Sequence, residues 1–433
     1  MSSTAPGTAT LDVRRNRRSL VAGTVGNFVE WYEFGAYGFF ATVIAANFFS
    51  STSTSDAESL IKTYASFALA FFFRPIGAAL FGRLGDRIGR RPTLILVLLL
   101  MTASTTLIGL LPTYATVGAA APWLLTLVRA LQGLSAGGEF GGAVAIMTEF
   151  APRTKRGLYG AWQSFTVALG LLTGAGLAAI LATVLSKAAL NDWGWRVPFL
   201  LALPLGLVAL WLRLRLEETP NFSRLQSTEV EVVDKTETAK AIALGIGRLM
   251  GWSAAGYTFL VVMPSYLQAT LNATFQQALV ATVLANAGFA LSILPAGWLS
   301  DRIGRRPVMA TGAALVVVLA FPLMNLLQDK ESSNAAKGIA VFVAGLVVGL
   351  MAGPGPAMLA EMFPTRARYT GLGLAYSLSN AVFSGSAGLI ITELIKRTKN
   401  IDIPAYYVAV TCAVSVVALL TLRGDDHRRE LRD

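Results

Sequence analysis

Ionisable side chains interrupt long apolar stretches of this 433-residue chain, among them Glu30, Glu33, Arg74, Arg129 and Glu139. A charge at the centre of a bilayer costs roughly 2.5–3.5 kcal/mol on insertion scales, so such residues are candidates for function. Glu30 and Glu33 lie three apart, on one face of a helix, and two carboxyl groups that close should titrate at different pH values. The pattern predicts proton coupling at Glu30, Glu33 and Glu139. The alternatives are an internal ion pair for the first two and helix anchoring for Glu139.

Arginine is suited to bind a carboxylate, which here is either a substrate's or that of Glu30. The faces of Trp and Tyr can hold a quaternary ammonium group by cation–π attraction, although helix packing is the plainer role for any one of them. Tyr376, Asn380 and Ser384 recur at four-residue spacing, as a neutral polar stripe on a helix would. The residues predicted to contact a substrate are Arg74, Arg129, Trp31, Tyr37, Gln132, Trp162, Tyr257, Tyr376 and Asn380.

The elements that position these residues must be membrane helices. Hydrophobic residues make up 54% of the chain and charged residues only 14%, against about 25% charged in soluble domains. Apolar runs of about 20 residues recur, and only helices satisfy their own backbone in lipid at that length. We expect an all-α protein with twelve transmembrane helices, over 19–49, 61–82, 93–112, 122–148, 158–185, 195–215, 240–270, 275–298, 308–328, 338–360, 369–395 and 403–422.

A basic, glycine-rich loop occurs twice. Gly82-Arg83-Leu84-Gly85-Asp86-Arg87-Ile88-Gly89-Arg90-Arg91-Pro92 returns at 297–307 with nine of eleven positions identical, so the chain consists of two related halves. The predicted divisions are a tail (1–18), a six-helix half (19–215), a linker (216–239), a second six-helix half (240–422) and a tail (423–433).

Within each loop, an aspartate among arginines can cap a helix N-terminus and pair with a cation, and the glycines permit close passage and sharp turns. We interpret the loops as a conformational latch that ties cytoplasmic helix ends together; the alternative is a topology signal that the arginines alone would provide. The predicted latch residues are Gly82, Asp86, Arg87, Gly89, Arg90, Asp301, Arg302, Gly304 and Arg305.

Most Lys and Arg residues fall on one side of the predicted spans, which places both termini in the cytoplasm of a multi-pass cell-membrane protein. This distribution also accounts for much of the net charge of +11 without nucleic acid. One cysteine and one histidine provide no catalytic pair or metal site, and no phosphate-binding loop occurs. We therefore expect no enzyme activity, no metal and no cofactor, with protons and a small metabolite as partners of a monomer.

The repeated loop after the second and eighth spans resembles that of the major facilitator superfamily, and the resemblance covers essentially the whole chain. Gly26-Asn27-Phe28-Val29-Glu30-Trp31-Tyr32-Glu33-Phe34, and Arg129-Ala130-Leu131-Gln132-Gly133 with the following Gly137–Gly142, resemble its metabolite:proton symporter branch. Glu33 stands where this branch would lead us to expect aspartate.

That resemblance implies a proton-coupled importer of a small carboxylate-bearing metabolite, most similar to proline/betaine carriers and working by alternating access. A permease for α-ketoglutarate or another di- or tricarboxylate is the alternative, favoured if Arg74 and Arg129 both face the cavity unpaired. A proton-driven drug exporter is a further one. Osmosensing relatives carry a long C-terminal coiled coil, which is not expected in a tail of about ten residues.

Overall fold

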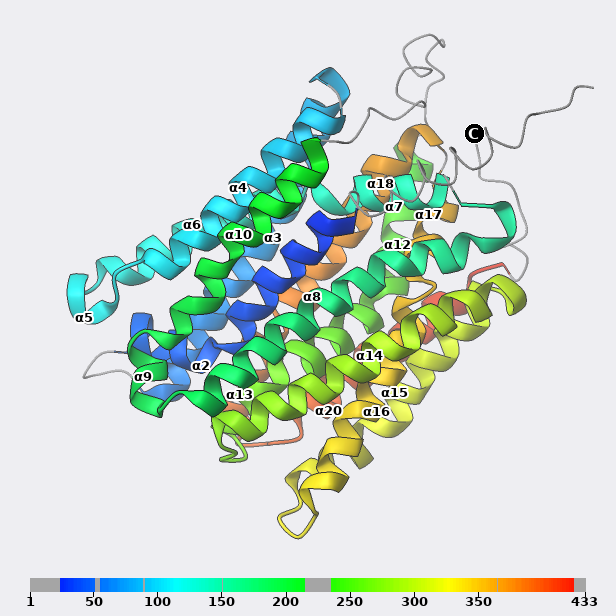
Figure 1. Ribbon diagram of the computed structural model, residues 1–433. Coiled ribbons are helices and arrows are strands. Elements are labelled where there is room, and N and C mark those ends of the chain that lie inside the picture. The colour runs from blue at the N-terminus through cyan, green and yellow to red at the C-terminus, as the bar shows by residue number, and fades with distance from the viewer. Residues whose placement is uncertain are drawn as a thin grey trace, which may run out of the picture.

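The computed structural model describes residues 24–50, 55–88, 90–149, 151–214, 235–363 and 365–423. Nearly all of these residues are helical, and none of them forms a strand. Figure 1 shows the long helices lying side by side in an elongated bundle, with short loops at its two ends. The fold class is therefore confirmed as all-α, with the helices in the order that the apolar runs predict.

The N-terminal half begins with a helix over residues 24–39. Its other elements are α2 (Ala41–Ile44), η1 (Ala45–Phe49), α3 (Asp56–Ile88), α4 (Arg90–Leu110), α5 (Tyr114–Val117), α6 (Ala120–Ala136), α7 (Glu139–Glu149), η2 (Arg153–Lys155), α8 (Arg156–Val184), α9 (Lys187–Asp192), η3 (Gly194–Arg196) and α10 (Val197–Leu214).

The C-terminal half follows residue 234. Its elements are α12 (Lys235–Tyr257), η4 (Thr258–Val262), α13 (Met263–Ala269), α14 (Phe275–Ile303), α15 (Arg305–Gln328), α16 (Asn334–Ala352), α17 (Gly355–Met362), α18 (Thr365–Ser379), η5 (Asn380–Gly385), α19 (Ala387–Thr398) and α20 (Ile403–Leu420).

Nine helical stretches in the described parts of the chain are long and apolar enough to cross a membrane. The other three expected spans, 19–49, 122–148 and 240–270, correspond to mostly helical residues over 24–49, 120–149 and 235–269, each divided into shorter segments. Together these stretches make the twelve-helix fold. The exact domain boundaries stay predictions, because residues 1–18, 216–234 and 424–433 lie outside the described ranges.

The span expected as one helix over 122–148 is in fact two, because α6 ends at Ala136 and α7 begins at Glu139. Its glycines lie against the backbone of α3: a Cβ at Gly133 would collide with the Ala70 carbonyl, and one at Gly137 with that of Arg74. Glycine is the residue that permits so close an approach. The break therefore sits where α6 crosses α3, between the candidate residues Arg129 and Glu139.

A second break separates α16 from α17 at Gly353 and Pro354. Pro356 has no amide to bond back to the Ala352 carbonyl four residues earlier. The Ser164 hydroxyl of α8 donates to that carbonyl at 2.7 Å, so a side chain of one half completes a helix end of the other.

Two π-helical segments interrupt spans of the C-terminal half. η4 begins directly after Tyr257, and η5 begins at Asn380. Segments of this kind occur often at functional sites, since they realign the side chains around them. Both predicted substrate residues thus lie at a local change in helix geometry that the sequence did not reveal.

Candidate functional site

Glu30 and Arg74 form an ion pair inside the N-terminal half. Glu30 Oε1 lies 3.0 Å from Arg74 Nη2, and both side chains are only 2% exposed. The guanidinium also packs over the Phe34 and Phe71 rings, each 4.3 Å from its centre. In such surroundings each charge depends on the other, because an unpaired buried charge is costly. This is the internal pairing that the sequence left open as an alternative to substrate contact.

Glu33 is fully buried and has a different kind of partner. Its Oε2 accepts a hydrogen bond of 2.5 Å from the Thr105 hydroxyl, and its Oε1 has no hydrogen-bond partner among the described residues. Thr105 Oγ1 in turn accepts from Gln132 Nε2 at 2.7 Å. Gln132 Oε1 accepts from Arg129 Nη1. A chain of donors therefore runs from the cationic Arg129 to the carboxyl group of Glu33, without direct contact between the two.

Arg129 is fully buried and forms no ion pair with any described carboxylate. Its guanidinium packs 4.1 Å from the Tyr37 ring centre and 4.9 Å from that of Phe67, and two of its nitrogens, Nε and Nη2, have no hydrogen-bond partner there. Tyr37 itself bonds Ser66 Oγ at 2.5 Å. Aromatic faces and one amide thus replace the carboxylate that a buried arginine usually meets.

Glu139 pairs with Arg213, which lies one residue before the end of α10. Arg213 is only 2% exposed and contacts the Glu139 carboxylate. Its other terminal nitrogen donates to the Leu94 carbonyl at 2.7 Å. A side chain at Gly26 would collide with this pair. The contacts join α4, α7 and α10 to the first helix and match the anchoring role that was the alternative for Glu139.

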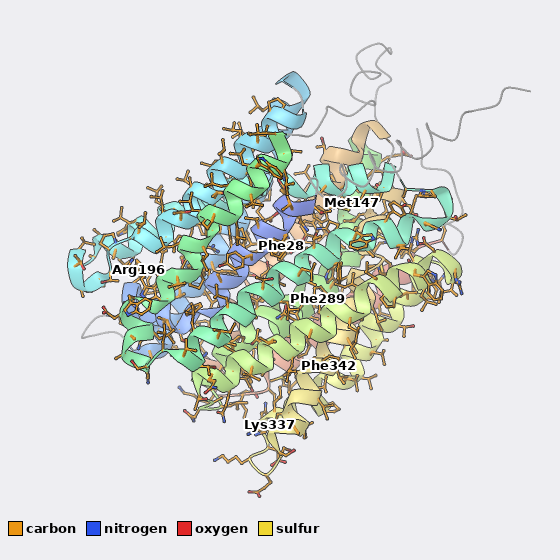
Figure 2. All side chains as sticks on the ribbon, in the orientation of Figure 1. Phe28, Met147, Arg196, Phe289, Lys337 and Phe342 are labelled. Carbon is orange, nitrogen blue, oxygen red and sulfur yellow. The ribbon has the colours of Figure 1, made fainter. Side chains whose placement is uncertain are left out.

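A central cavity lies between the two halves. Aromatic and neutral polar residues form most of its wall, with no charged side chain among them: Trp31, Val167, Leu171, Trp252, Ser253, Gly256, Tyr257, Leu260, Val261, Phe289, Tyr376, Asn380 and Ser384. Phe289 is labelled on α14 in Figure 2. The cavity holds about 30 Å³, and a buried water needs roughly 10–15 Å³ on this measure. A few waters fit, whereas a metabolite requires the halves to separate.

Of the predicted substrate residues, Trp31, Tyr257, Tyr376 and Asn380 line this cavity. The Tyr257 hydroxyl, on a side chain only 5% exposed, has no hydrogen-bond partner among the described residues. Arg74, Arg129, Tyr37 and Gln132 instead pack within the N-terminal half. Trp162 is 44% exposed and stacks edge-on against Phe165, away from the cavity wall.

The site predictions omitted Trp252, Ser253 and Phe289, which also form the wall. Trp252 lies 6.1 Å from Tyr376 between ring centres. Tyr376 stacks flat against Phe140 of α7 at 3.4 Å, which joins the two halves. Density of aromatic residues near 252–257 was the one sequence signal for Trp252, and nothing in the sequence distinguishes Ser253 or Phe289 from packing residues.

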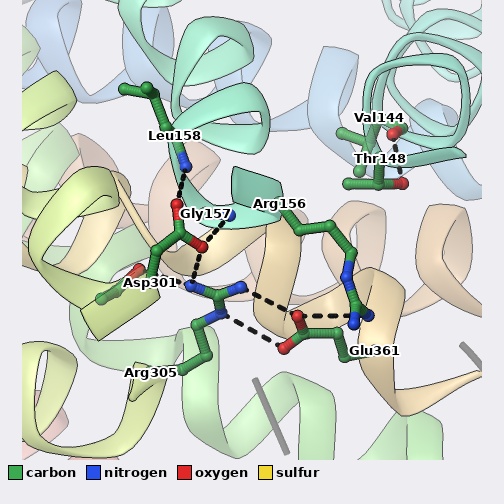
Figure 3. Close-up of polar contacts among 9 residues, drawn as sticks. Val144, Thr148, Arg156, Gly157, Leu158, Asp301, Arg305 and Glu361 are labelled. Carbon is green, nitrogen blue, oxygen red and sulfur yellow. Dashed lines mark hydrogen bonds and ion pairs between the residues drawn. The ribbon is translucent and has the colours of Figure 1, made fainter. Parts of the chain in front are cut away.

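Charged side chains from the two halves meet beside the second copy of the repeated loop (Figure 3). Asp301 accepts hydrogen bonds from the amides of Gly157 at 2.7 Å and Leu158 at 2.9 Å. These amides belong to the first turn of α8, where donors lack partners within the helix. A carboxylate of the C-terminal half thus caps a helix of the N-terminal half and meets the positive end of its dipole.

Arg305 extends this junction. It bonds Asp301 at 2.8 Å and both oxygens of Glu361, at 2.9 and 3.2 Å. Arg156 Nη1 lies 3.6 Å from the same Glu361. We call these four side chains, Asp301, Arg305, Glu361 and Arg156, the charged junction. Arg156 and Glu361 were not among the predicted latch residues.

The other latch predictions differ in what the structure describes. Arg302 packs over the Trp298 ring at 3.8 Å, and Gly304 has φ 99°, which favours glycine. Gly89 lies outside the described residues. Of Gly82, Asp86, Arg87 and Arg90, the structure describes only the helical backbone.

Comparisons with known proteins give a consistent assignment. The family model described as sugar (and other) transporter matches residues 19–238, and that of the Major Facilitator Superfamily matches 244–433. The proline/betaine transporter of Escherichia coli K12 is 33% identical, over 96% of this chain and 85% of its own length. The ectoine/proline transporter ProP of Corynebacterium glutamicum is 36% identical, over 93% and 83%.

The alpha-ketoglutarate permease of Escherichia coli K12 is 35% identical, over 94% of this chain and 93% of its own length. Among solved structures, the proton:xylose symporter XylE bound to 6-bromo-6-deoxy-D-glucose has a TM-score of 0.78 at 18% identity, over 94% of this chain and 95% of its own. That likeness shows the fold. With the sequence relatives, it places the chain among multi-pass membrane transporters rather than enzymes: it belongs to the major facilitator superfamily and, within it, to the metabolite:proton symporter branch.

Proposed function

We propose that this chain is a proton-coupled symporter that imports a small zwitterionic carboxylate of the proline/betaine type by alternating access. The observation that carries the proposal is Glu33, a fully buried carboxyl group without a cation in direct contact among the described residues. A carboxyl group in that setting can exist neutral, and it can ionise when water or a cation reaches it. That is the property a proton carrier needs.

The first helix connects this carboxyl group to the cavity. Trp31 is in the cavity wall, and Glu33, two residues on, bonds Thr105 within the N-terminal half. A rotation or shift of residues 24–39 as substrate enters therefore moves both. Glu30 has a structural role in this scheme, as the partner of Arg74, and Glu139 has one as the partner of Arg213.

The cavity wall suits a zwitterion. The rings of Trp31, Trp252 and Tyr376 offer faces to a cationic ammonium group, and the unpartnered hydroxyl of Tyr257 can donate to a carboxylate. The names of the proline/betaine and ectoine/proline relatives agree with this substrate class.

A dicarboxylate is the second candidate, because the α-ketoglutarate permease is similarly close in sequence. Two carboxylates would require two cations at the cavity, and Arg74 and Arg129 were the candidates. Arg74 is instead occupied by Glu30, and Arg129 is covered by aromatic rings. The cavity in this conformation therefore favours the zwitterion.

In this scheme the halves rock about the central cavity, and the charged junction is the latch that holds one end shut. The proton gradient is the sole driving force, with no cofactor. The transporter works as a monomer in the cell membrane, with both termini and the charged junction on the cytoplasmic side.

Uptake into proteoliposomes tests the proposal. Radiolabelled L-proline, glycine betaine, a monocarboxylate and α-ketoglutarate are supplied with and without an inward proton gradient. We expect a zwitterion to accumulate only with the gradient. Accumulation that ignores acidification would refute the symport mechanism, preferential uptake of α-ketoglutarate would transfer the assignment to dicarboxylates, and net expulsion would indicate a drug exporter.

A further inference from the structure

A second and much larger cavity lies at the end of the bundle opposite the charged junction. It holds about 310 Å³ and is lined by residues of α3, η4, α13, α19 and the loop after α19: Ala57, Leu60, Val262, Ser265, Tyr266, Ala269, Thr270, Ile391, Thr392, Ile395, Lys396, Lys399 and Ile401. We call it the lysine cleft. Helix α3 belongs to the N-terminal half and the other walls to the C-terminal half, so the cleft opens along their boundary.

The cleft carries positive charge that has no ion-pair partner among the described residues. Lys396 and Lys399 are in its wall, and no acidic residue is. The acids nearest to them in sequence are engaged elsewhere: Glu393 pairs with Arg397 at 2.5 Å, and Asp402 accepts from Gln328 at 2.9 Å. Neither lysine forms an ion pair within the described parts of the chain. Both lysine side chains are exposed at the cleft wall, and a cleft that is lined by charges of one sign and has apolar walls attracts anions more strongly than an open surface does.

Lys399 also has a backbone conformation that costs energy. It follows the last turn of α19 with φ 59° and ψ 13°, the left-handed region that glycine usually occupies at this position. A non-glycine residue there is strained, and such strain is found preferentially at functional sites. A lysine occupies this position, where glycine would fit more easily, and it lies in the cleft wall.

A buried hydroxyl in the cleft wall connects the cleft to the residues around the central cavity. Ser265, which lines the cleft and is only 2% exposed, shares a hydrogen bond of 2.6 Å with Tyr64 of α3. Tyr64 packs against Phe67, whose ring lies 6.1 Å from that of Tyr257 in the central cavity wall. A hydroxyl pair and a column of rings therefore separate the two cavities, and the hydroxyl pair crosses the boundary between the halves.

We propose that the lysine cleft is an external capture site for carboxylate-bearing substrates, in which Lys396 and Lys399 hold the carboxylate before the Tyr64–Ser265 contact opens. The inference rests on the proposed function for its direction, since the cleft faces outward when the termini are cytoplasmic. It requires only a carboxylate, so a zwitterion and a dicarboxylate both qualify.

Kinetics of inward uptake test the capture site. The double variant Lys396→Gln/Lys399→Gln should raise the KM for glycine betaine about fivefold at low salt, because losing roughly one charge contact in water weakens binding by about that factor. The maximal rate should stay unchanged. Added KCl should weaken uptake by the parent protein and not by the variant. Lys330→Gln/Lys337→Gln is the charge-matched control at the α15–α16 hairpin, where Figure 2 labels Lys337.

A binding measurement separates this site from transport. Lysines of the purified full-length protein are acetylated with a water-soluble ester and quantified by mass spectrometry. Glycine betaine or α-ketoglutarate should slow the labelling of Lys396 and Lys399, and choline, which lacks the carboxylate, should not. Equal kinetic effects in the control variant, or labelling that neither carboxylate slows, would overturn the capture site. Absence of proton-driven uptake with intact protection would instead refute the proposed function alone.

Discussion

The two halves bury different kinds of polar group. The N-terminal half encloses the Glu30–Arg74 and Glu139–Arg213 pairs, together with Glu33 and Arg129. The C-terminal half offers the cavity only neutral side chains, such as Ser253, Asn380 and Ser384. Its buried acids, Asp301 and Glu361, lie at the charged junction, away from the cavity.

This difference predicts different roles for the two halves. Ion pairs inside one half make it rigid, since moving one partner leaves an unpaired charge in a low-dielectric interior, which costs free energy. Neutral hydroxyls and amides can exchange partners with a substrate at small cost. We infer that the N-terminal half handles the proton and that the C-terminal half provides most of the adaptable substrate surface.

The largest effect on the proposed difference between the halves is expected from Glu33→Gln. Gradient-driven accumulation of substrate should fall to background, because the amide cannot release a proton. Exchange of labelled for unlabelled substrate across the membrane should continue. Glu33→Asp is the matched control and should retain coupling. Accumulation by the glutamine variant at the parent level would exclude Glu33 as the proton site.

Breaking the Glu30–Arg74 pair should come next in size. Arg74→Met should lower the free energy of unfolding by about 3–5 kcal/mol, since it strands a buried carboxylate. Glu30→Gln/Arg74→Met removes both charges and should recover most of that stability. Thermal unfolding in detergent measures both. If the double variant is as unstable as the single one, the loss of stability does not come from an unpaired charge on Glu30.

The Glu139–Arg213 pair can be disturbed from the first helix. Gly26→Ala should cost about 1–3 kcal/mol of stability, the usual range for overpacking, because the added methyl group overlaps the guanidinium. Gly176→Ala is the control, since nothing lies within 4 Å of a Cβ there. Equal melting temperatures for the two variants would show that α10 shifts freely, contrary to a rigid half.

The smallest expected effect concerns the aromatic wall. Trp31→Leu should raise the KM of a zwitterion by roughly 2–30-fold, which corresponds to a cation–π contribution of about 0.5–2 kcal/mol. Trp162→Leu should leave the KM nearly unchanged, because this side chain lies outside the cavity wall. The KM for glycine betaine is measured for both variants in uptake assays. Equal KM values would contradict the assignment of the cavity as the substrate site.

Much of the architecture could be predicted from particular residues. Apolar length located the helices, and the repeat around Asp86 and Asp301 revealed the two halves. The break before Glu139 could not be predicted, since it depends on how closely Gly133 and Gly137 approach α3. The pairing of Arg213 with Glu139 could not be predicted either, because near the end of an apolar run the sequence does not distinguish a surface arginine from one with a buried partner.

The site was predicted less completely. Charge inside apolar runs identified Glu30, Glu33, Arg74 and Arg129 as a group, but their pairing depends on which helices adjoin. Thr105 could not be recognised, because a threonine in a membrane helix usually bonds its own backbone. Its role beside Glu33 appears only when α4 packs against the first helix.

The cap that Asp301 places on α8 has a consequence for measurement. Whenever the charged junction opens, the amides of Gly157 and Leu158 lose their acceptors and face water at a bare helix end. The rate of hydrogen–deuterium exchange at these two amides should therefore rise with the frequency of junction opening, and no introduced label is needed to measure it. The exchange of these two backbone protons thus reports on opening of the charged junction.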